Sequence, residues 1–198
     1  FSCTRGRALA LYAWHTFFSV LYAVFVILNG GDALAYYSAS FGTELQFGLG
    51  TSAVKVLASV FSQGLGFSFL GLSLVFGFFG FIGLIAFDAA LRAVTQYKKS
   101  KIQRVTTILV FLPSVSFWSS GLGKDSISFM AMGLMLWASL SIHRRYLLLL
   151  IAALAMLFVR PHMAGIMVMA LAFSLVINKK TPIFQRSVIG AGAMAASA

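Results

Sequence analysis

Long apolar runs separated by short polar segments dominate the sequence. The first two runs cover residues 8–28 and 67–86, and each has about the 20 residues that a helix needs to cross a bilayer. Gly77, Gly80 and Gly83 recur at three-residue spacing in the second run, which predicts a stripe of small residues for close helix packing. The pattern therefore predicts a membrane-spanning helix in each run.

Shorter apolar runs fill the second half of the chain. They cover residues 105–117, 126–142, 146–159 and 164–177, and another begins at Ser187. Pro113 is expected to interrupt the first of them. Runs of about 13 or 14 residues make helices of roughly 20 Å, which is less than the bilayer core of about 30 Å. We therefore expect an all-α, polytopic transmembrane helix bundle with about six to seven spans, some short or re-entrant. We expect a single transmembrane domain over residues 1–198, truncated at both ends. Residues 51–61, with Lys55 among them, predict an amphipathic helix lying on the membrane.

Composition agrees with this prediction. The 198 residues are 60% hydrophobic and 10% charged, with a mean hydropathy of +0.95, whereas a soluble domain has about 25% charged residues. The net charge of +11 comes from short basic clusters between apolar runs, which is the positive-inside pattern and not that of a nucleic-acid-binding protein. The lone Cys3 excludes an internal disulfide between cysteines of this chain.

The basic clusters predict the orientation of the chain. If residues 5–7, 92–104, 144–145 and 179–186 all face the cytoplasm, the N-terminus is cytoplasmic and the remaining charges face outside. That outer set comprises Asp32, Glu44, Lys55, Lys124, Asp125, Arg160 and His162. Asp88 and Arg92, four residues apart, are expected to pair with each other. His15, inside the first span, is expected to be a packed residue rather than a ligand.

Lys124 and Asp125 stand together between two apolar runs. Charged residues in such a place favour a functional site. Gly123-Lys124 does not complete a phosphate-binding P-loop, because Trp118 occupies the place of its first glycine and Asp125 that of its Ser or Thr.

Cations on the outer side predict an anion-binding site. Lys124, Arg160 and His162 could clamp a phosphate, with hydroxyls from Ser119 and Ser120 and the N-terminus of a helix starting near Ser126. The alternative is structural. In that case Lys124 pairs with Asp125 or Glu44, and Arg160 caps a helix or reaches lipid headgroups.

Asp32 follows a Gly-Gly break directly after the first span. It could act as a general base or bind a divalent metal, or it could be an ordinary helix-flanking or N-cap residue. Tyr36 and Tyr37 could stack on sugar rings or belong to an interfacial aromatic belt.

Three segments carry a family resemblance. GDALAYY at 31–37 is similar to the first-loop Asp motif of GT-C-type membrane glycosyltransferases. The segments LPS at 112–114, FWSSGLGKD at 117–125 and RPH at 160–162 resemble bacterial proteins of that type and Wzy/EpsG-like polysaccharide polymerases. The resemblance covers roughly residues 8–180.

The resemblance implies a bacterial inner-membrane enzyme that takes a sugar from a polyprenyl-phosphate-linked donor on the extracytoplasmic face, in cell-envelope glycan assembly. Asp32 would then be the catalytic base or a metal ligand, and Lys124, Arg160 and His162 would contact the lipid phosphate. Asp125 and Glu44 are the candidates for a second acid. No metal site follows from the sequence itself. A polysaccharide repeat-unit polymerase, a membrane transporter or flippase, and a non-catalytic scaffold remain alternatives.

Overall fold

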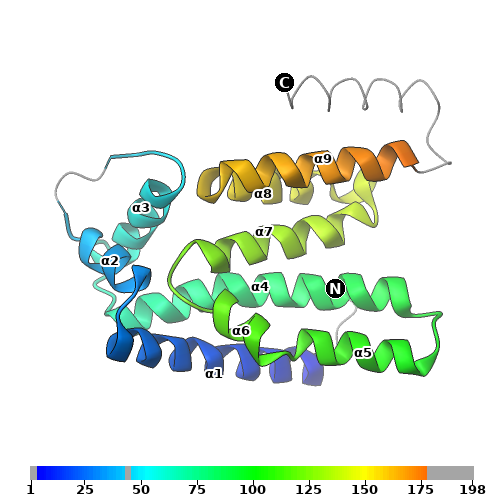
Figure 1. Ribbon diagram of the computed structural model, residues 1–198, viewed down its shortest axis with the longest axis horizontal. Helices are drawn as coiled ribbons and strands as arrows, with labels where there is room; N and C mark the ends of the chain where they lie inside the picture. Colours follow the sequence, from blue (N-terminus) through cyan, green and yellow to red (C-terminus); the bar gives the residue numbers. More distant parts are fainter. Residues whose placement is uncertain (1–3, 43–45, 178–198) are drawn as a thin grey trace.

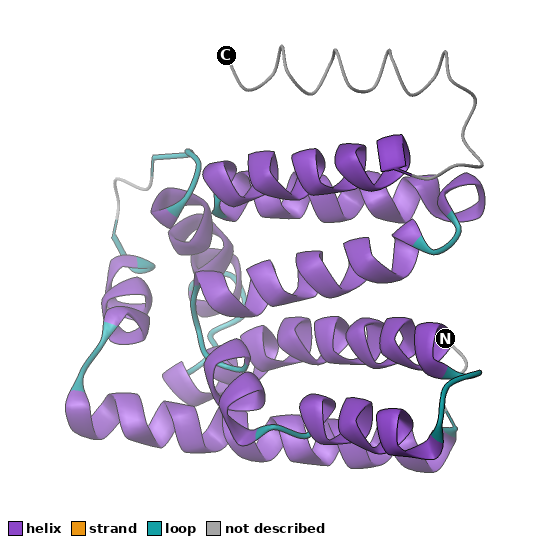
Figure 2. Cartoon of the chain, turned by 45° about the vertical axis from the view of Figure 1, so that its right-hand side comes forward, coloured by secondary structure: helices purple, strands orange, loops and turns teal. Residues whose placement is uncertain are grey.

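All regular structure in the described part of the chain is helical. The computed structural model describes residues 4–42 and 46–177, and Figure 2 shows helices joined by short connections. The helices in these ranges are α1 (Arg5–Asn29), α2 (Asp32–Ala39), α3 (Thr51–Ser62), α4 (Phe69–Thr95), α5 (Ser100–Val110), α6 (Pro113–Ser119), α7 (Lys124–Ser139), α8 (Ile142–Val159) and α9 (Pro161–Ile177). The predicted all-α class is confirmed.

Three of the described helices qualify as candidate membrane spans. Within the described ranges, α1, α4 and α8 are long and apolar enough to cross a membrane. The other helices are shorter, α7 with 16 residues and α9 with 17. The expected six to seven spans are therefore not confirmed, whereas a helical membrane protein with three candidate spans is supported.

The apolar run 105–117 is divided between two helices. Residue Leu112 has an extended backbone, and Pro113 begins α6. Proline disfavours a helical conformation at the residue before it and fits the first turn of a new helix. The predicted interruption at Pro113 is confirmed, and it divides the run into α5 and α6. The amphipathic stretch at 51–61 does form a helix, α3.

The helices lie roughly antiparallel in layers. Figure 1 shows α1, α4 and α5 along one side, α7 in the middle, and α8 with α9 along the other side. The short helices α2 and α3 lie at one end of the bundle, where α1 ends and α4, α7 and α9 begin. This arrangement brings the start of α7 and the α8–α9 junction to the same end as Asp32.

The predicted glycine stripe holds α4 against its neighbours. A Cβ atom at Gly83 would lie 2.7 Å from the Met130 Cα atom of α7, and one at Gly80 would overlap the Ser119 carbonyl oxygen. Small residues here let backbones approach closely. His15 lies beside Gly80 with 1% of its surface exposed, so it is a packed residue, as predicted.

A buried ion-pair cluster ties α1 to α4 at the opposite end. The Asp88 carboxylate is 1% exposed and accepts hydrogen bonds from Arg7 at 2.6 Å and from Arg92 at 2.9 Å. The predicted Asp88–Arg92 pair is confirmed, and Arg7 joins it from 81 residues away. We call this end, with its basic connections around residues 98–104 and 143–145, the basic end.

Candidate active site at the charged end

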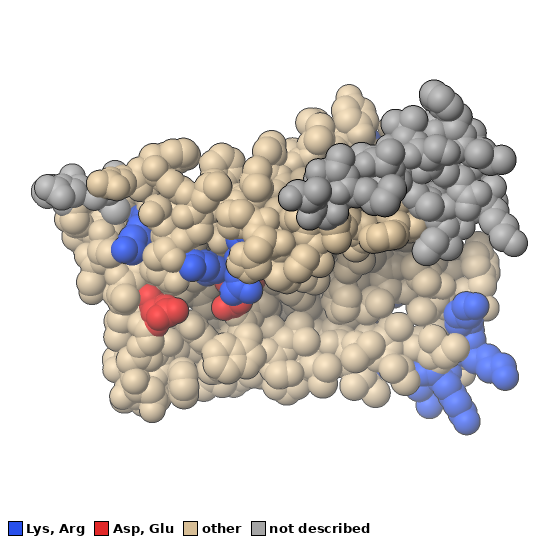
Figure 3. All heavy atoms as spheres, turned by 45° about the horizontal axis from the view of Figure 1, so that its top comes forward, with Lys and Arg blue, Asp and Glu red and all other residues tan. Residues whose placement is uncertain are grey.

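The end of the bundle opposite the basic end carries charges of both signs, and we call it the charged end. It comprises the α1–α2 turn, α2, the start of α7 and the α8–α9 junction. Figure 3 shows acidic and basic side chains close together on one part of the surface, with a separate, purely basic group at the far end. Within the described ranges, the clustered basic residues and the predicted mixed-sign set thus lie at opposite ends of the bundle.

Asp32 owes its position to the two glycines before it. Gly30 and Gly31 have φ values of +78° and +145°, which glycine adopts without strain. They end α1 and turn the chain into α2, whose first residue is Asp32. The Asp32 side chain is exposed there. Its carboxylate therefore faces the outside of the bundle at a helix N-terminus, where a negative charge is favoured.

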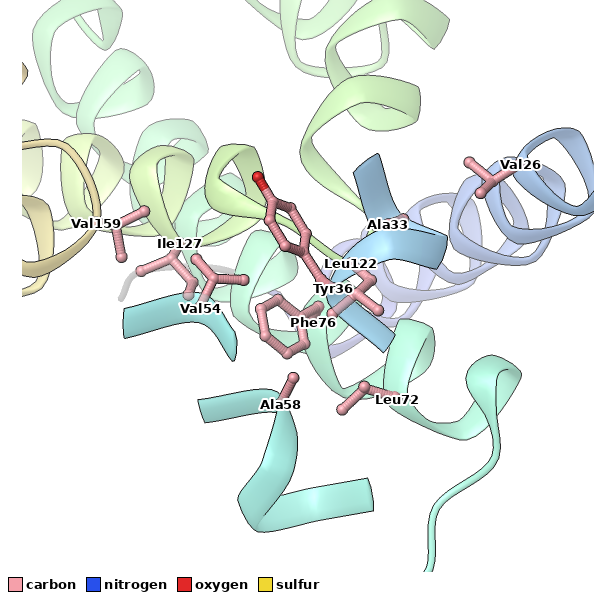
Figure 4. Packing of buried hydrophobic residues seen from close by; sticks show 10 residues of the cluster. All are labelled: Val26, Ala33, Tyr36, Val54, Ala58, Leu72, Phe76, Leu122, Ile127 and Val159. Atoms are coloured by element: carbon pink, nitrogen blue, oxygen red, sulfur yellow. The ribbon is translucent and has the colours of Figure 1, made fainter. Parts of the chain in front are cut away.

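Tyr36 lies one turn further along α2 and is 7% exposed. Figure 4 shows its ring among apolar side chains of several helices, with the hydroxyl pointing away from Ala58 and Leu72. The ring also lies beside the turn before α7, where a Cβ atom at Gly123 would be 3.7 Å from it. Tyr36 therefore joins the apolar core to the charged end.

The surroundings of the Tyr36 hydroxyl favour its protonated form. Burial raises its pKa, and the Asp32 carboxylate raises it further, while a hydrogen bond with Thr51 opposes the shift. Asp125 raises the pKa and Arg160 lowers it by weaker electrostatic effects. The hydroxyl is therefore a neutral hydrogen-bonding group within electrostatic reach of both carboxylates and the guanidinium.

Asp125 and Arg160 form an ion pair across the charged end. The Arg160 Nη2 atom donates to the Asp125 Oδ1 atom at 2.5 Å, and the two side chains are 31% and 58% exposed, respectively. The expected structural alternative for Lys124 was a pair with Asp125 or Glu44. Asp125 pairs with Arg160 instead, and Glu44 lies outside the described residues. Lys124 itself begins α7 and is half-buried. The expected alternative for Arg160 was a helix cap or a contact with lipid headgroups. Its side chain instead binds Asp125 and so links the end of α8 to α7.

The α8–α9 junction positions Arg160 through its backbone. Arg160 departs from helical geometry, with φ −145° and ψ 81°, and Pro161 begins α9. Proline forces this break because the residue before it avoids helical geometry. The Arg160 amide still donates to the Met156 carbonyl oxygen at 2.7 Å. His162 follows on the first turn of α9 and is exposed.

The two predicted serines differ in what they can reach. Both hydroxyls donate to carbonyl oxygens of their own segment, Ser119 to Val115 at 2.6 Å and Ser120 to Phe117 at 3.1 Å. Ser119 nevertheless lines a surface hollow with Asp125 and Arg160. Ser120 is fully buried, and its carbonyl oxygen accepts from Ser19 at 3.1 Å, so it anchors the loop to α1. The structure therefore does not bring the Ser120 hydroxyl to the surface of the site.

A hollow opens beside the Asp125–Arg160 pair. It has a volume of about 270 Å³ and lies between α6, α7, α8 and α9. Its lining residues are Ser114, Val115, Trp118, Ser119, Asp125, Ser128, Phe129, Met132, Met156, Arg160 and Met163. The ion pair is thus at the edge of a concave, largely apolar surface, as is usual for ligand sites.

The charged end also includes residues that sequence reasoning missed. The Tyr22 hydroxyl, on α1, is within electrostatic reach of Asp125 and Asp32. The Tyr22 ring would overlap a Cβ atom at Gly121, so this glycine is required where the α6–α7 loop meets α1. In the sequence Tyr22 is one more aromatic residue of an apolar run. Its nearness to both aspartates follows only from the fold.

Two predictions concern ligands or residues beyond this cluster. Glu44, a candidate second acid, lies outside the described residues. Among the residues that the structure describes, no group of three or more His, Cys, Asp or Glu side chains could hold a metal ion. The described site therefore consists of carboxylates, cations and tyrosine hydroxyls.

Comparisons with known proteins add no family to this description. No protein-family model, no curated protein and no solved structure matches the chain.

Proposed function

We propose that this protein is a membrane glycosyltransferase that moves a sugar from a polyprenyl-phosphate-linked donor to an acceptor hydroxyl on the extracytoplasmic face. The observation that carries the proposal is the convergence of Asp32, Asp125 and Arg160 around Tyr36 at one end of the bundle, where all three charges act on its hydroxyl and the last two pair with each other. This end lies apart from the basic clusters that the positive-inside pattern assigns to the cytoplasm.

The residue types match the two demands of the reaction. The Asp32 carboxylate takes the proton of the acceptor hydroxyl, whose oxygen forms the new bond to the anomeric carbon of the sugar. The bond between that carbon and the phosphate oxygen breaks, and the lipid phosphate leaves with the electron pair. Arg160 and Lys124 stabilise the negative charge that develops on the departing phosphate.

Tyr36 fits this scheme as a positioning residue. Its neutral hydroxyl lies in the electrostatic field of Asp32 and can donate a hydrogen bond to a sugar hydroxyl. A polysaccharide repeat-unit polymerase runs the same reaction with a lipid-linked acceptor, so the two activities share these residues and differ in the acceptor.

The Asp32→Asn variant tests the proposal. Transfer of radiolabelled sugar from a polyprenyl-phosphate-linked donor is measured with the full chain in proteoliposomes. Loss of the base is expected to lower the rate by about 10²- to 10⁴-fold. Ser38→Ala is the matched control, because Ser38 is exposed on the same helix, α2.

The thermal unfolding midpoint of Asp32→Asn should match that of the wild type, since the side chain is exposed. A wild-type transfer rate in Asp32→Asn would contradict the proposal. Flux of the lipid-linked sugar across the vesicle without any covalent product would instead favour a transporter.

A further inference from the structure

One face of α5 changes from basic to apolar along the helix. Residues three, four and seven positions apart lie on the same face of a helix. In α5 this spacing joins Lys101, Arg104, Val105 and Ile108, and all four side chains are exposed. Val105 and Ile108 are 54% and 62% exposed, respectively. We call this face the α5 stripe. Its two cations lie nearest the basic end of the bundle.

The opposite face of α5 holds the helix against the bundle. Thr106 and Val110 are 7% and 1% exposed. The Gln103 side-chain amide donates to the carbonyl oxygens of Thr95 and Gln96, at 3.3 and 3.2 Å, where α4 ends. These contacts fix which side of α5 meets α4. The α5 stripe therefore faces away from α4.

The cations at this corner have no acidic partner among the described residues. Four exposed cations stand between positions 98 and 104, namely Lys98, Lys99, Lys101 and Arg104. None of them forms an ion pair with a described residue. Within the described ranges, the one carboxylate at the basic end is that of Asp88, which is buried and held by Arg7 and Arg92. The corner therefore carries an excess of positive charge, and Figure 3 shows a purely basic group at this end.

The α5 stripe lies at the level where a bilayer surface meets the bundle. The helix α4 is long and apolar enough to cross a membrane, and Figure 1 shows α5 alongside it. From Lys101 to Ile108 the helix rises roughly 10 Å, which fits within one leaflet of a hydrocarbon core about 30 Å thick. Tyr97, in the connection before α5, is 91% exposed, and tyrosine is enriched at membrane interfaces. The cations thus stand at the level of the headgroups, and the apolar residues at that of the acyl chains.

We infer that the α5 stripe binds an anionic phospholipid of the leaflet at the basic end. The lipid phosphate lies at Lys101 and Arg104, and the acyl chains lie along Val105 and Ile108. Charge complementarity carries the inference, because exposed cations without an acidic partner attract anionic headgroups. The apolar half of the stripe favours a lipid over an acidic protein. The inference does not depend on the proposed function, which is assigned to the other end of the bundle.

Equilibrium binding of three probes to the full chain in micelles of an uncharged detergent tests the inference. The probes are dioctanoyl-phosphatidylglycerol, the zwitterionic dioctanoyl-phosphatidylcholine, and glycerol 3-phosphate, which supplies an anionic head without acyl chains. We expect phosphatidylglycerol to bind the wild type at least about tenfold more tightly than either of the others, since each cation near an anionic headgroup adds about fivefold.

Charge-removing variants locate the site. Arg104→Gln should weaken phosphatidylglycerol binding by about fivefold, and Lys101→Gln combined with Arg104→Gln by at least about tenfold. Arg104→Lys keeps the charge and should change the affinity by less than about twofold. Arg144→Gln is the matched control, because Arg144 is an exposed arginine of the same end on α8, and its effect should also stay below about twofold. The thermal unfolding midpoint of Arg104→Gln should match that of the wild type, since the side chain is exposed.

Three results would overturn the inference. Equal losses in Arg104→Gln and Arg144→Gln would show that only the overall charge of the basic end attracts the lipid. Equal affinity of the wild type for phosphatidylglycerol and phosphatidylcholine would leave the cations to another partner, such as an acidic protein. Glycerol 3-phosphate binding as tightly as phosphatidylglycerol would show a site for a soluble anion.

Discussion

Each end of the helix bundle holds an ion pair between aspartate and arginine, but the two pairs are built differently. At the basic end Asp88 is 1% exposed and is held by two arginines from different helices. At the charged end Asp125 is 58% exposed and meets a single arginine. The first pair is enclosed by protein, whereas the second lines a surface hollow.

The difference separates a structural pair from one that a ligand can reach. Removing one partner of a buried pair costs about 3–5 kcal/mol, because the remaining charge is left uncompensated. An exposed pair contributes only about 0–1 kcal/mol. The Asp125–Arg160 pair therefore adds little to folding and can exchange its partner for an anionic ligand without much loss of stability.

The largest expected effect is at the basic end. Asp88→Ala leaves Arg7 and Arg92 without the carboxylate they share, so we expect the free energy of unfolding to fall by about 3–5 kcal/mol. Equilibrium unfolding in mixed detergent micelles measures this loss. Asp125→Ala is the matched control at the charged end, and its loss should stay below about 1 kcal/mol. Equal losses in the two variants would remove the distinction between the ends.

A smaller effect is expected where α4 meets α7. Gly83→Leu places side-chain atoms against the Met130 backbone, and overpacking of this kind costs about 1–3 kcal/mol. The same unfolding measurement applies. Gly165→Leu is the control, because a Cβ atom at Gly165 has no neighbour within 4 Å. A Gly83 variant as stable as the Gly165 variant would show that close approach at the glycine stripe is not required.

Local sequence signals predicted the features that depend on neighbouring residues. The glycine stripe, the break at Pro113 and the Asp88–Arg92 pair each follow from spacing within one segment. The sorting of charged clusters between the ends follows from the order of apolar runs. The number of membrane spans could not be predicted from the apolar runs. Runs near the minimum length can form short helices, such as α5, α6 and α7, as well as full spans.

Contacts between segments far apart in the chain could not be predicted from the sequence. Arg7 and Asp88 are 81 residues apart, and Asp125 and Arg160 are 35 apart. The sequence assigns Arg7 to a basic cluster and Arg160 to a candidate anion site, but spacing alone does not say which acid meets which cation. The place of Tyr22 and the hollow beside Asp125 and Arg160 depend in the same way on how the helices pack. The sequence therefore predicted which residue types gather at one end of the bundle, and it did not predict which of them pair.

The smallest expected effect on stability comes from exchanging the pair at the charged end, and this double variant tests the central claim most directly. Asp125→Arg combined with Arg160→Asp keeps both charges and should change the free energy of unfolding by less than about 1 kcal/mol. It moves the cation away from the α8–α9 junction. Because a misplacement of about 1 Å can lower a rate about 10²-fold, sugar transfer from the polyprenyl-linked donor should fall at least about 100-fold. Wild-type transfer by the exchanged variant would contradict the account, since it would show that Asp125 and Arg160 serve only to hold α7 and α8 together.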